Sequence, residues 1–202
     1  MKDLFINGIG VGKDPSLIHR DFLYKNNFDK IGGDKKNIIH IKKFISDEEC
    51  FNILNVAFSS IPEKILGNDQ WSEKLYKTDD LVFTLEILNK IKNKIIEIYK
   101  INVKNSHDIP FVTRWSSGDS MSMHVDDLGT PQNHISAVIY LNENYDGGEI
   151  FFPTHNLKIK PGTGDLVVFP GNLNYPHQVE KIINGDRYTL PSWFSFVDEL
   201  EN

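Results

Sequence analysis

The second half of the chain consists of short apolar runs separated by Gly, Pro, Asn and Asp. After residue 108 these runs recur at fairly even spacing, at 110–115, 135–141, 149–152, 157–160, 166–169, 177–183 and 188–197. Short runs bounded by turn residues are typical of β-strands, and several in succession indicate a sandwich, a jelly roll or a barrel. This half therefore predicts an all-β body.

Two amphipathic segments in the first half predict helices. Ser46 and Glu49 form the Ser-x-x-Glu pattern, in which each side chain caps the other's backbone N–H, so a helix is expected from about 47 to 60. From 78 to about 101, apolar residues recur every three or four positions, at Leu81, Leu85, Leu88, Ile91, Ile95 and Ile98. We expect both helices to cover one face of the β body.

The chain is expected to form a single domain over residues 1–202, because no internal repeat or long linker divides it. Residues 1–107 would supply an N-terminal irregular segment (1–37), a strand at 38–44 and the supporting helices. Residues 108–202 would form the β core. The predicted fold class is mainly β with supporting helices.

Composition narrows the chemistry that the chain can carry. The single cysteine, Cys50, excludes an internal disulfide framework and a cluster of thiolates, so a bound metal would need histidine and carboxylate ligands. A net charge of -6 disfavours a nucleic-acid partner, whose phosphates are held mainly by Lys and Arg. No apolar run approaches the ~18 residues of a membrane span, and no long apolar stretch of a signal peptide is present. We expect a soluble, cytoplasmic protein with no membrane partner.

His124, Asp126 and His177 form the pattern that carries chemistry. Side chains two residues apart in an extended segment point the same way, so His124 and Asp126 can face one point. His177 on a neighbouring strand would complete the facial triad of non-haem Fe(II) oxygenases, which leaves three coordination positions open. Zinc hydrolases use the same ligand types with one open position. Seven histidines and 28 acidic residues also make a chance His-x-Asp a real alternative.

Arg187 favours the metal-site interpretation. It follows His177 by ten residues, within a body full of apolar residues. A permanently charged guanidinium in such surroundings requires a carboxylate partner. A dicarboxylate held by a metal at one end and by Arg187 at the other would supply it.

Further motifs surround these four residues in a fixed order. They are Arg114-Trp115-Ser116-Ser117-Gly118, Ile139-Tyr140-Leu141-Asn142, Gly147-Gly148-Glu149-Ile150-Phe151-Phe152-Pro153, the run 161–169, Pro176-His177, Gly185-Asp186-Arg187-Tyr188 and Trp193-Phe194. Jointly they resemble the prolyl 4-hydroxylase-like branch of the Fe(II)/2-oxoglutarate-dependent dioxygenases, over residues 110–197. The resemblance implies a double-stranded β-helix (jelly roll) core packed against N-terminal α-helices.

The resemblance also implies a role for each matched residue. His124, Asp126 and His177 would bind Fe(II). Arg187 and the hydroxyl of Tyr140 would hold the distal carboxylate of 2-oxoglutarate, and Trp193 would line the metal pocket. O2 would be the oxidant, ascorbate would support turnover, and a prolyl residue of a peptide or protein would be hydroxylated as 2-oxoglutarate becomes succinate and CO2.

Four positions depart from the family pattern. Trp115 stands for a tyrosine, Met121 for an aromatic residue and Ile150 for a threonine. Pro191 interrupts the last predicted strand, where we expect weaker pairing. None of the four is a predicted metal ligand. His155 is the rival third ligand, but no basic residue follows it at the family interval.

Two polar segments, 63–77 and 127–134, are expected at the mouth of the site, where they would select the substrate. Nucleic-acid demethylase relatives carry a second arginine six positions after the first, where this chain has Trp193. Two alternatives stay open: an oxygenase acting on a free amino acid or small metabolite, and a non-catalytic jelly-roll binding module. A zinc hydrolase would not account for Arg187, because its reaction requires no second site for a carboxylate. The sequence leaves the oligomeric state open.

Overall fold

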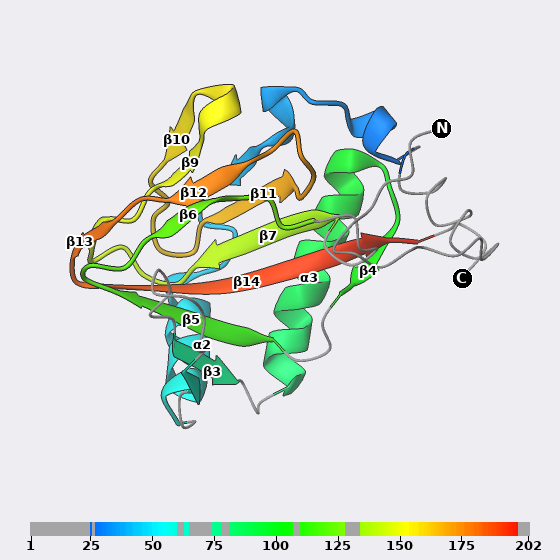
Figure 1. The fold of residues 1–202 in the computed structure, drawn as a ribbon. Helices are drawn as coiled ribbons and strands as arrows, with labels where there is room; N and C mark the ends of the chain where they lie inside the picture. The colour runs from blue at the N-terminus through cyan, green and yellow to red at the C-terminus, as the bar shows by residue number, and fades with distance from the viewer. Residues whose placement is uncertain are drawn as a thin grey trace.

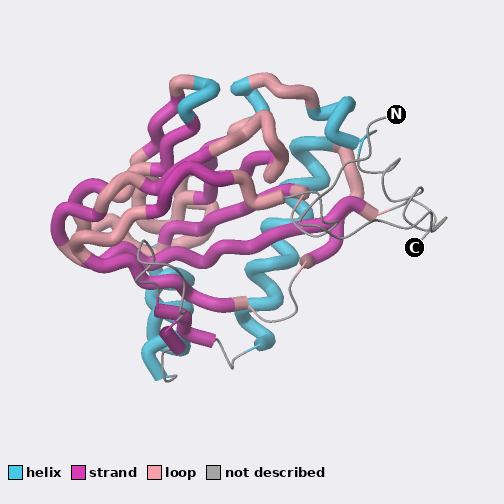
Figure 2. Tube along the Cα trace, viewed as in Figure 1, coloured by secondary structure: helices cyan, strands magenta, loops and turns pink. Residues whose placement is uncertain are grey.

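In the described part of the chain, the fold consists of two large β-sheets, one two-stranded sheet and two long helices (Figure 1). The structure is a computed structural model that describes residues 25, 27–59, 63–64, 74–77, 81–106, 110–127 and 134–197. Strands are the main regular secondary structure in the second half of the chain, as Figure 2 shows. The mainly β class predicted from the sequence is confirmed.

The larger sheet has eight antiparallel strands in the order β1-β11-β7-β14-β5-β3-β2, with β4 also paired to β14. They are β1 (Ile39–Ile41), β2 (Glu63–Lys64), β3 (Lys74–Lys77), β4 (Val103–Asn105), β5 (Phe111–Ser116), β7 (Ile135–Tyr140), β11 (Leu166–Pro170) and β14 (Asp186–Phe196). Strands from the first half of the chain thus extend the sheet built by the second half.

The smaller sheet has four antiparallel strands in the order β10-β9-β12-β6. They are β6 (Met121–His124), β9 (Ile150–Phe152), β10 (Leu157–Ile159) and β12 (His177–Val179), and a separate pair joins β8 (Asp146–Gly147) to β13 (Ile182–Asn184). In Figure 1 this sheet lies across from the larger one. Buried side chains from both sheets, including Tyr140, Phe152 and Phe169, pack in one cluster. Two facing antiparallel sheets form the predicted jelly roll.

Two helices pack against the larger sheet. α2 (Asp47–Ser59) begins at the predicted capping box, where the Ser46 N–H donates to Glu49 Oε2 (2.8 Å) and the Glu49 N–H donates to Ser46 Oγ (3.1 Å). α3 (Leu81–Tyr99) buries Ile91 and Ile95 in the same apolar cluster as Phe194 of β14. Among the described residues, no helix is long and apolar enough to cross a membrane.

Several segments differ from the prediction. Residues 27–31, expected to be irregular, form a helical turn, because Phe28 packs edge-to-face on Phe196 with ring centroids 4.9 Å apart. A 3-10 turn follows at Lys35–Asn37, and residues 1–24 lie outside the described part of the chain. Within the predicted loop 63–77, β2 and β3 pair with each other, and β3 also pairs with β5. The rest of that loop is not described.

The sequence predicted that Pro191 would interrupt the last strand, but it does not. β14 runs through it, and Pro191 lies opposite Val138 of β7. On the other edge of β14, pairing with β5 ends at Thr189 and pairing with β4 begins at Phe194. Pro191 lies between these two partners, where a residue without a backbone N–H breaks no ladder hydrogen bond.

Candidate metal centre

The three predicted metal ligands come together at one end of the smaller sheet. His124 ends β6 and lies directly opposite His177, the first residue of β12, while Asp126 follows two residues after His124. Oδ1 of Asp126 is 3.4 Å from Nε2 of His124 and 3.8 Å from Nε2 of His177. One ligand atom from each residue lies within 4.8 Å of the other two. The register of β6 and β12 therefore assembles the cluster that the sequence predicted.

Hydrogen bonds orient all three side chains. Nδ1 of His124 lies 2.9 Å from the carbonyl of Ser122, and Nδ1 of His177 lies 3.2 Å from the carbonyl of Tyr175. A carbonyl only accepts, so each Nδ1 carries the proton and each Nε2 keeps a lone pair for a metal. Ser136 Oγ donates to Oδ2 of Asp126 at 2.5 Å, which leaves Oδ1 to face the imidazoles.

Electrostatics keep the carboxylate ionised and His177 neutral. Burial would raise the pKa of Asp126, but its interactions with the His124 and His177 side chains and the hydrogen bond from the Ser136 hydroxyl outweigh burial and lower that pKa to about 2. Burial lowers the pKa of His177 to about 4, with the Asp126 charge opposing the shift. His177 is only 4% exposed, and its ring packs against Phe152 and Phe169. Neutral imidazole and ionised carboxylate are the forms that bind divalent metals.

The donor set fits Fe(II). Two imidazole nitrogens and one carboxylate oxygen converge on one side, which is the ligand set of non-haem iron oxygenases with open positions. No cysteine or second carboxylate joins this cluster among the residues that the structure describes. His155, the rival ligand, lies elsewhere: its ring stacks on Tyr175 at 5.0 Å, and its Nε2 is 3.2 Å from the carbonyl of Gly33.

Arg187 is a buried cation that has no anionic partner among the residues that the structure describes. Its side chain is 3% exposed, and its guanidinium lies over the rings of Trp115 (5.0 Å) and Tyr140 (5.7 Å). Nη1 donates to the carbonyl of Gly148 at 3.2 Å, while the buried Nε has no hydrogen-bond partner. Within the described part of the chain, no carboxylate pairs with it. A buried guanidinium in this state is a binding site for an anion.

Tyr140 lies beside this cation and faces the metal ligands. It is 1% exposed; burial raises its pKa, and the charge of Arg187 opposes that rise. Tyr140 and Ser136 lie on the same face of β7, because they are four residues apart in one strand. Since Ser136 bonds Asp126, the guanidinium and the metal ligands share the space between the sheets.

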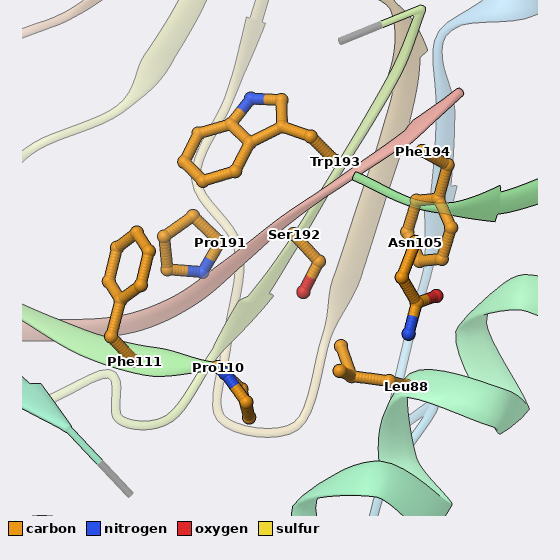
Figure 3. A pocket seen from close by; sticks show the side chains of 8 residues that line it. All are labelled: Leu88, Asn105, Pro110, Phe111, Pro191, Ser192, Trp193 and Phe194. Carbon is orange, nitrogen blue, oxygen red and sulfur yellow. The ribbon is translucent and has the colours of Figure 1, made fainter. Parts of the chain in front are cut away.

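Trp193 lies on the same face of β14 as Arg187, six residues away and directly opposite Ser136. Figure 3 shows its indole beside Pro191 and Phe111, while Ser192 and Phe194 extend toward the side of α3. The ring centroids of Trp193 and Phe111 are 6.0 Å apart. The pocket of Figure 3, lined by residues such as Leu88 and Asn105, contains none of the metal ligands.

Sequence reasoning missed Ser136 and did not foresee what Trp115 does. Trp115 stacks its ring on Arg187, and its indole N–H donates to Thr113 Oγ1 at 3.3 Å. Asp127, expected in a mouth loop, is 2% exposed, and its N–H donates to the carbonyl of Gly171 at 3.0 Å. The remainder of that loop, 128–133, lies outside the described residues.

Comparisons with known proteins agree with this geometry. Residues 110–195 match the family model of the 2OG-Fe(II) oxygenase superfamily. A PKHD-type hydroxylase from Prochlorococcus marinus (strain AS9601) is 31% identical over 123 residues, 57% of this chain and 54% of that protein. Prolyl 3-hydroxylase 2 from Mus musculus is 34% identical over 65 residues, 30% of this chain and 9% of that protein. The chain thus spans about half of one relative and about a tenth of the other.

Solved structures share the fold. A prolyl hydroxylase from Trichoplax adhaerens, in complex with a hypoxia inducible factor oxygen degradation domain peptide fragment, has a TM-score of 0.65 at 17% identity. The likeness covers 92% of this chain and 94% of that one. The sequence motifs and the family match both cover the strands that carry the His-Asp-His cluster and Arg187. The segment that matches the 2OG-Fe(II) oxygenase family model, residues 110–195, is thus the segment whose motifs predicted a prolyl 4-hydroxylase-like oxygenase core.

Proposed function

We propose that the protein is a Fe(II)/2-oxoglutarate-dependent dioxygenase that hydroxylates a prolyl residue of a peptide or protein. The observation that carries the proposal is Arg187, a 3% exposed guanidinium with no carboxylate partner among the described residues. It shares the space between the sheets with the His124-Asp126-His177 cluster. A ligand with one end for a metal and a carboxylate at the other satisfies both sites, and 2-oxoglutarate is such a ligand.

In this proposal each residue has a defined task. His124, Asp126 and His177 hold Fe(II), and Arg187 with the Tyr140 hydroxyl holds the distal carboxylate, so the keto acid end reaches the metal. Trp193 lines the pocket around the metal. Bound Fe(II) with 2-oxoglutarate and O2 supplies the oxidation of a C–H bond, and ascorbate supports repeated turnover.

Charge balance makes burial of this assembly tolerable. The charges of Fe(II) and Arg187 cancel those of Asp126 and the dicarboxylate. The assembly is therefore neutral as a whole, which lowers the free-energy cost of burying it away from water. The stacked rings of Trp115 and Tyr140 keep water from Arg187, and Phe152 and Phe169 cover the ring of His177. Exclusion of water strengthens each of these ionic contacts.

The peptide substrate is supported by the relatives. Two of the proteins described above are named prolyl hydroxylases, and one was solved with a peptide. The net charge of -6 disfavours a nucleic acid in the same role. We also propose that residues 1–202 act as a single domain, because β1 to β4 belong to the same sheet as β5, β7, β11 and β14.

Succinate formation from 2-oxoglutarate tests the proposal. The assay contains Fe(II), ascorbate and a panel of proline-containing peptides, and compares the wild type with His124→Ala and Arg187→Ala. We expect peptide-dependent succinate and a +16 Da peptide in the wild type, and neither product in the variants. Turnover that no peptide stimulates, but a free amino acid does, would remove the prolyl assignment. No succinate under any condition would contradict the oxygenase itself.

A further inference from the structure

Tyr145 carries a buried hydroxyl that nothing in the described chain satisfies. The residue lies between β7 and β8, is 5% exposed, and its hydroxyl has no hydrogen-bond partner. Leaving a buried hydroxyl unpaired costs free energy, so most such groups in proteins are bonded. An unpaired hydroxyl at a binding site is therefore a candidate contact for the ligand.

The Tyr145 ring is held in place on several sides. Lys160 Nζ lies 3.8 Å from the ring centroid and donates to the Tyr145 carbonyl at 3.1 Å. Ile182 and Trp115 pack with the ring in one buried cluster. Because both the backbone and the ring are fixed, the hydroxyl cannot turn out into water to find a partner.

The ring lies next to Arg187, with only a glycine between them. A Cβ on Gly148 would lie 3.2 Å from Cε2 of Tyr145 and 3.4 Å from Cδ of Arg187. Burial raises the pKa of Tyr145, and the nearby charge of Arg187 opposes that rise. Tyr145, Tyr140 and Arg187 are therefore buried close to one another, and Trp115 contacts both Tyr145 and Arg187.

We propose that the Tyr145 hydroxyl is a third donor to the distal carboxylate of 2-oxoglutarate, beside Arg187 and Tyr140. This assignment rests on the proposed function. A carboxylate offers about four acceptor sites, more than Arg187 and Tyr140 alone occupy. Hydrogen bonds to a charged group are stronger than neutral ones, so ligand binding converts an unpaired hydroxyl into a favourable contact.

The test compares two ligands that bind a metal in the same way. 2-Oxoglutarate and 2-oxopentanoate share the keto acid end, but 2-oxopentanoate has a methyl group in place of the distal carboxylate. Both are titrated calorimetrically into the Mn(II)-loaded protein without O2. We expect Tyr145→Phe to weaken 2-oxoglutarate binding roughly tenfold or more, and to leave 2-oxopentanoate binding unchanged.

Tyr99→Phe is the matched control. Tyr99 is a partly buried tyrosine of α3 whose hydroxyl donates to the carbonyl of Asn37 at 2.7 Å, away from Arg187. We expect Tyr99→Phe to lower the unfolding midpoint of the metal-free protein and to bind 2-oxoglutarate like the wild type. Tyr145→Phe should instead keep or raise that midpoint, because it removes an unpaired polar group.

Three results would overturn the assignment. Unchanged 2-oxoglutarate binding in Tyr145→Phe would show that the hydroxyl is no donor. Equal weakening of both ligands would show that the ring only shapes the pocket. Both of these leave the proposed function intact, whereas a wild type that binds no 2-oxoglutarate would overturn the proposed function and this assignment together.

Discussion

The hydroxyl of Ser136 donates a hydrogen bond of 2.5 Å to Oδ2 of Asp126, and thereby joins the two sheets at the metal centre. Ser136 belongs to β7 of the larger sheet, whereas Asp126 follows β6 of the smaller one. Because Oδ2 is engaged, Oδ1 is the oxygen that faces Nε2 of His124 and of His177. The orientation of the carboxylate thus depends on how the sheets pack.

Ser136→Ala should weaken metal binding without abolishing it. Loss of the partner that orients a ligand typically lowers metal affinity 10- to 100-fold. Titration of Mn(II), followed by electron paramagnetic resonance, measures the effect. Ser192→Ala is the control, because Ser192 is a buried serine of β14 that extends toward the side of α3 (Figure 3). Equal Mn(II) affinity in Ser136→Ala and the wild type would refute the role of this hydrogen bond.

Gly148→Ala should disturb the packing around Arg187, because a Cβ there would meet Tyr145 and Ile182 too closely. A Cβ at this position would lie 2.3 Å from Cδ1 of Ile182 and 3.4 Å from Cδ of Arg187, at a φ of +67°. Gly118 has a φ of +100° and open space around it, so Gly118→Ala carries backbone strain without a clash. Both variants should lose ~1–2 kcal/mol of unfolding free energy from that strain.

Only Gly148→Ala should also bind 2-oxoglutarate less tightly, by about tenfold or more, because a contact with the charged carboxylate is disturbed. Isothermal titration of 2-oxoglutarate into the Mn(II)-loaded variants separates the two effects. If Gly118→Ala loses as much affinity as Gly148→Ala, backbone strain and not the disturbed packing around Arg187 is the cause.

His134 should make the fold sensitive to acid. It is 3% exposed, and the Phe196 N–H donates to its Nδ1 at 2.8 Å, so the native ring is neutral. Burial lowers the pKa of His134 from its ordinary 6.5 to about 4. Between these pH values the unfolded chain binds a proton that the native protein does not. The contribution of His134 is therefore complete above pH 6.5 and declines by up to about 3 kcal/mol as the pH falls to 4.

Urea unfolding at pH 7 and pH 4.5 measures this loss. The matched variant is His134→Asn, whose amide oxygen can accept the Phe196 N–H and does not titrate. We expect the variant to lose less unfolding free energy than the wild type between the two pH values. Parallel losses in the two proteins would assign the acid sensitivity to other groups.

Local patterns in the sequence predict much of the fold. The start of α2 follows from Ser46 and Glu49, whose side chains cap each other within one turn. The metal cluster is predictable because His124 and Asp126 lie two residues apart in an extended segment. The anion-binding role of Arg187 is predictable because a buried cation needs an anionic partner. Each of these inferences uses neighbours in sequence or a single chemical requirement.

Features that depend on packing between distant segments could not be predicted. Ser136 has no motif that marks it as a partner of Asp126, since the contact exists only where the two sheets meet. The unpaired hydroxyl of Tyr145 becomes apparent only once Lys160 and Ile182 enclose the ring. Proline usually interrupts strands, but Pro191 lies at a point of β14 between its pairing with β5 and its pairing with β4.

The central claim is that the His-Asp-His cluster and Arg187 together bind 2-oxoglutarate. Calorimetric titration of 2-oxoglutarate into the wild type, with and without Mn(II) and without O2, tests it most directly, with Arg187→Met as the comparison. Methionine fills a similar volume without the charge. The account predicts metal-dependent binding by the wild type and at least about a tenfold loss in Arg187→Met. Metal-independent binding, or equal affinity in both proteins, would contradict it.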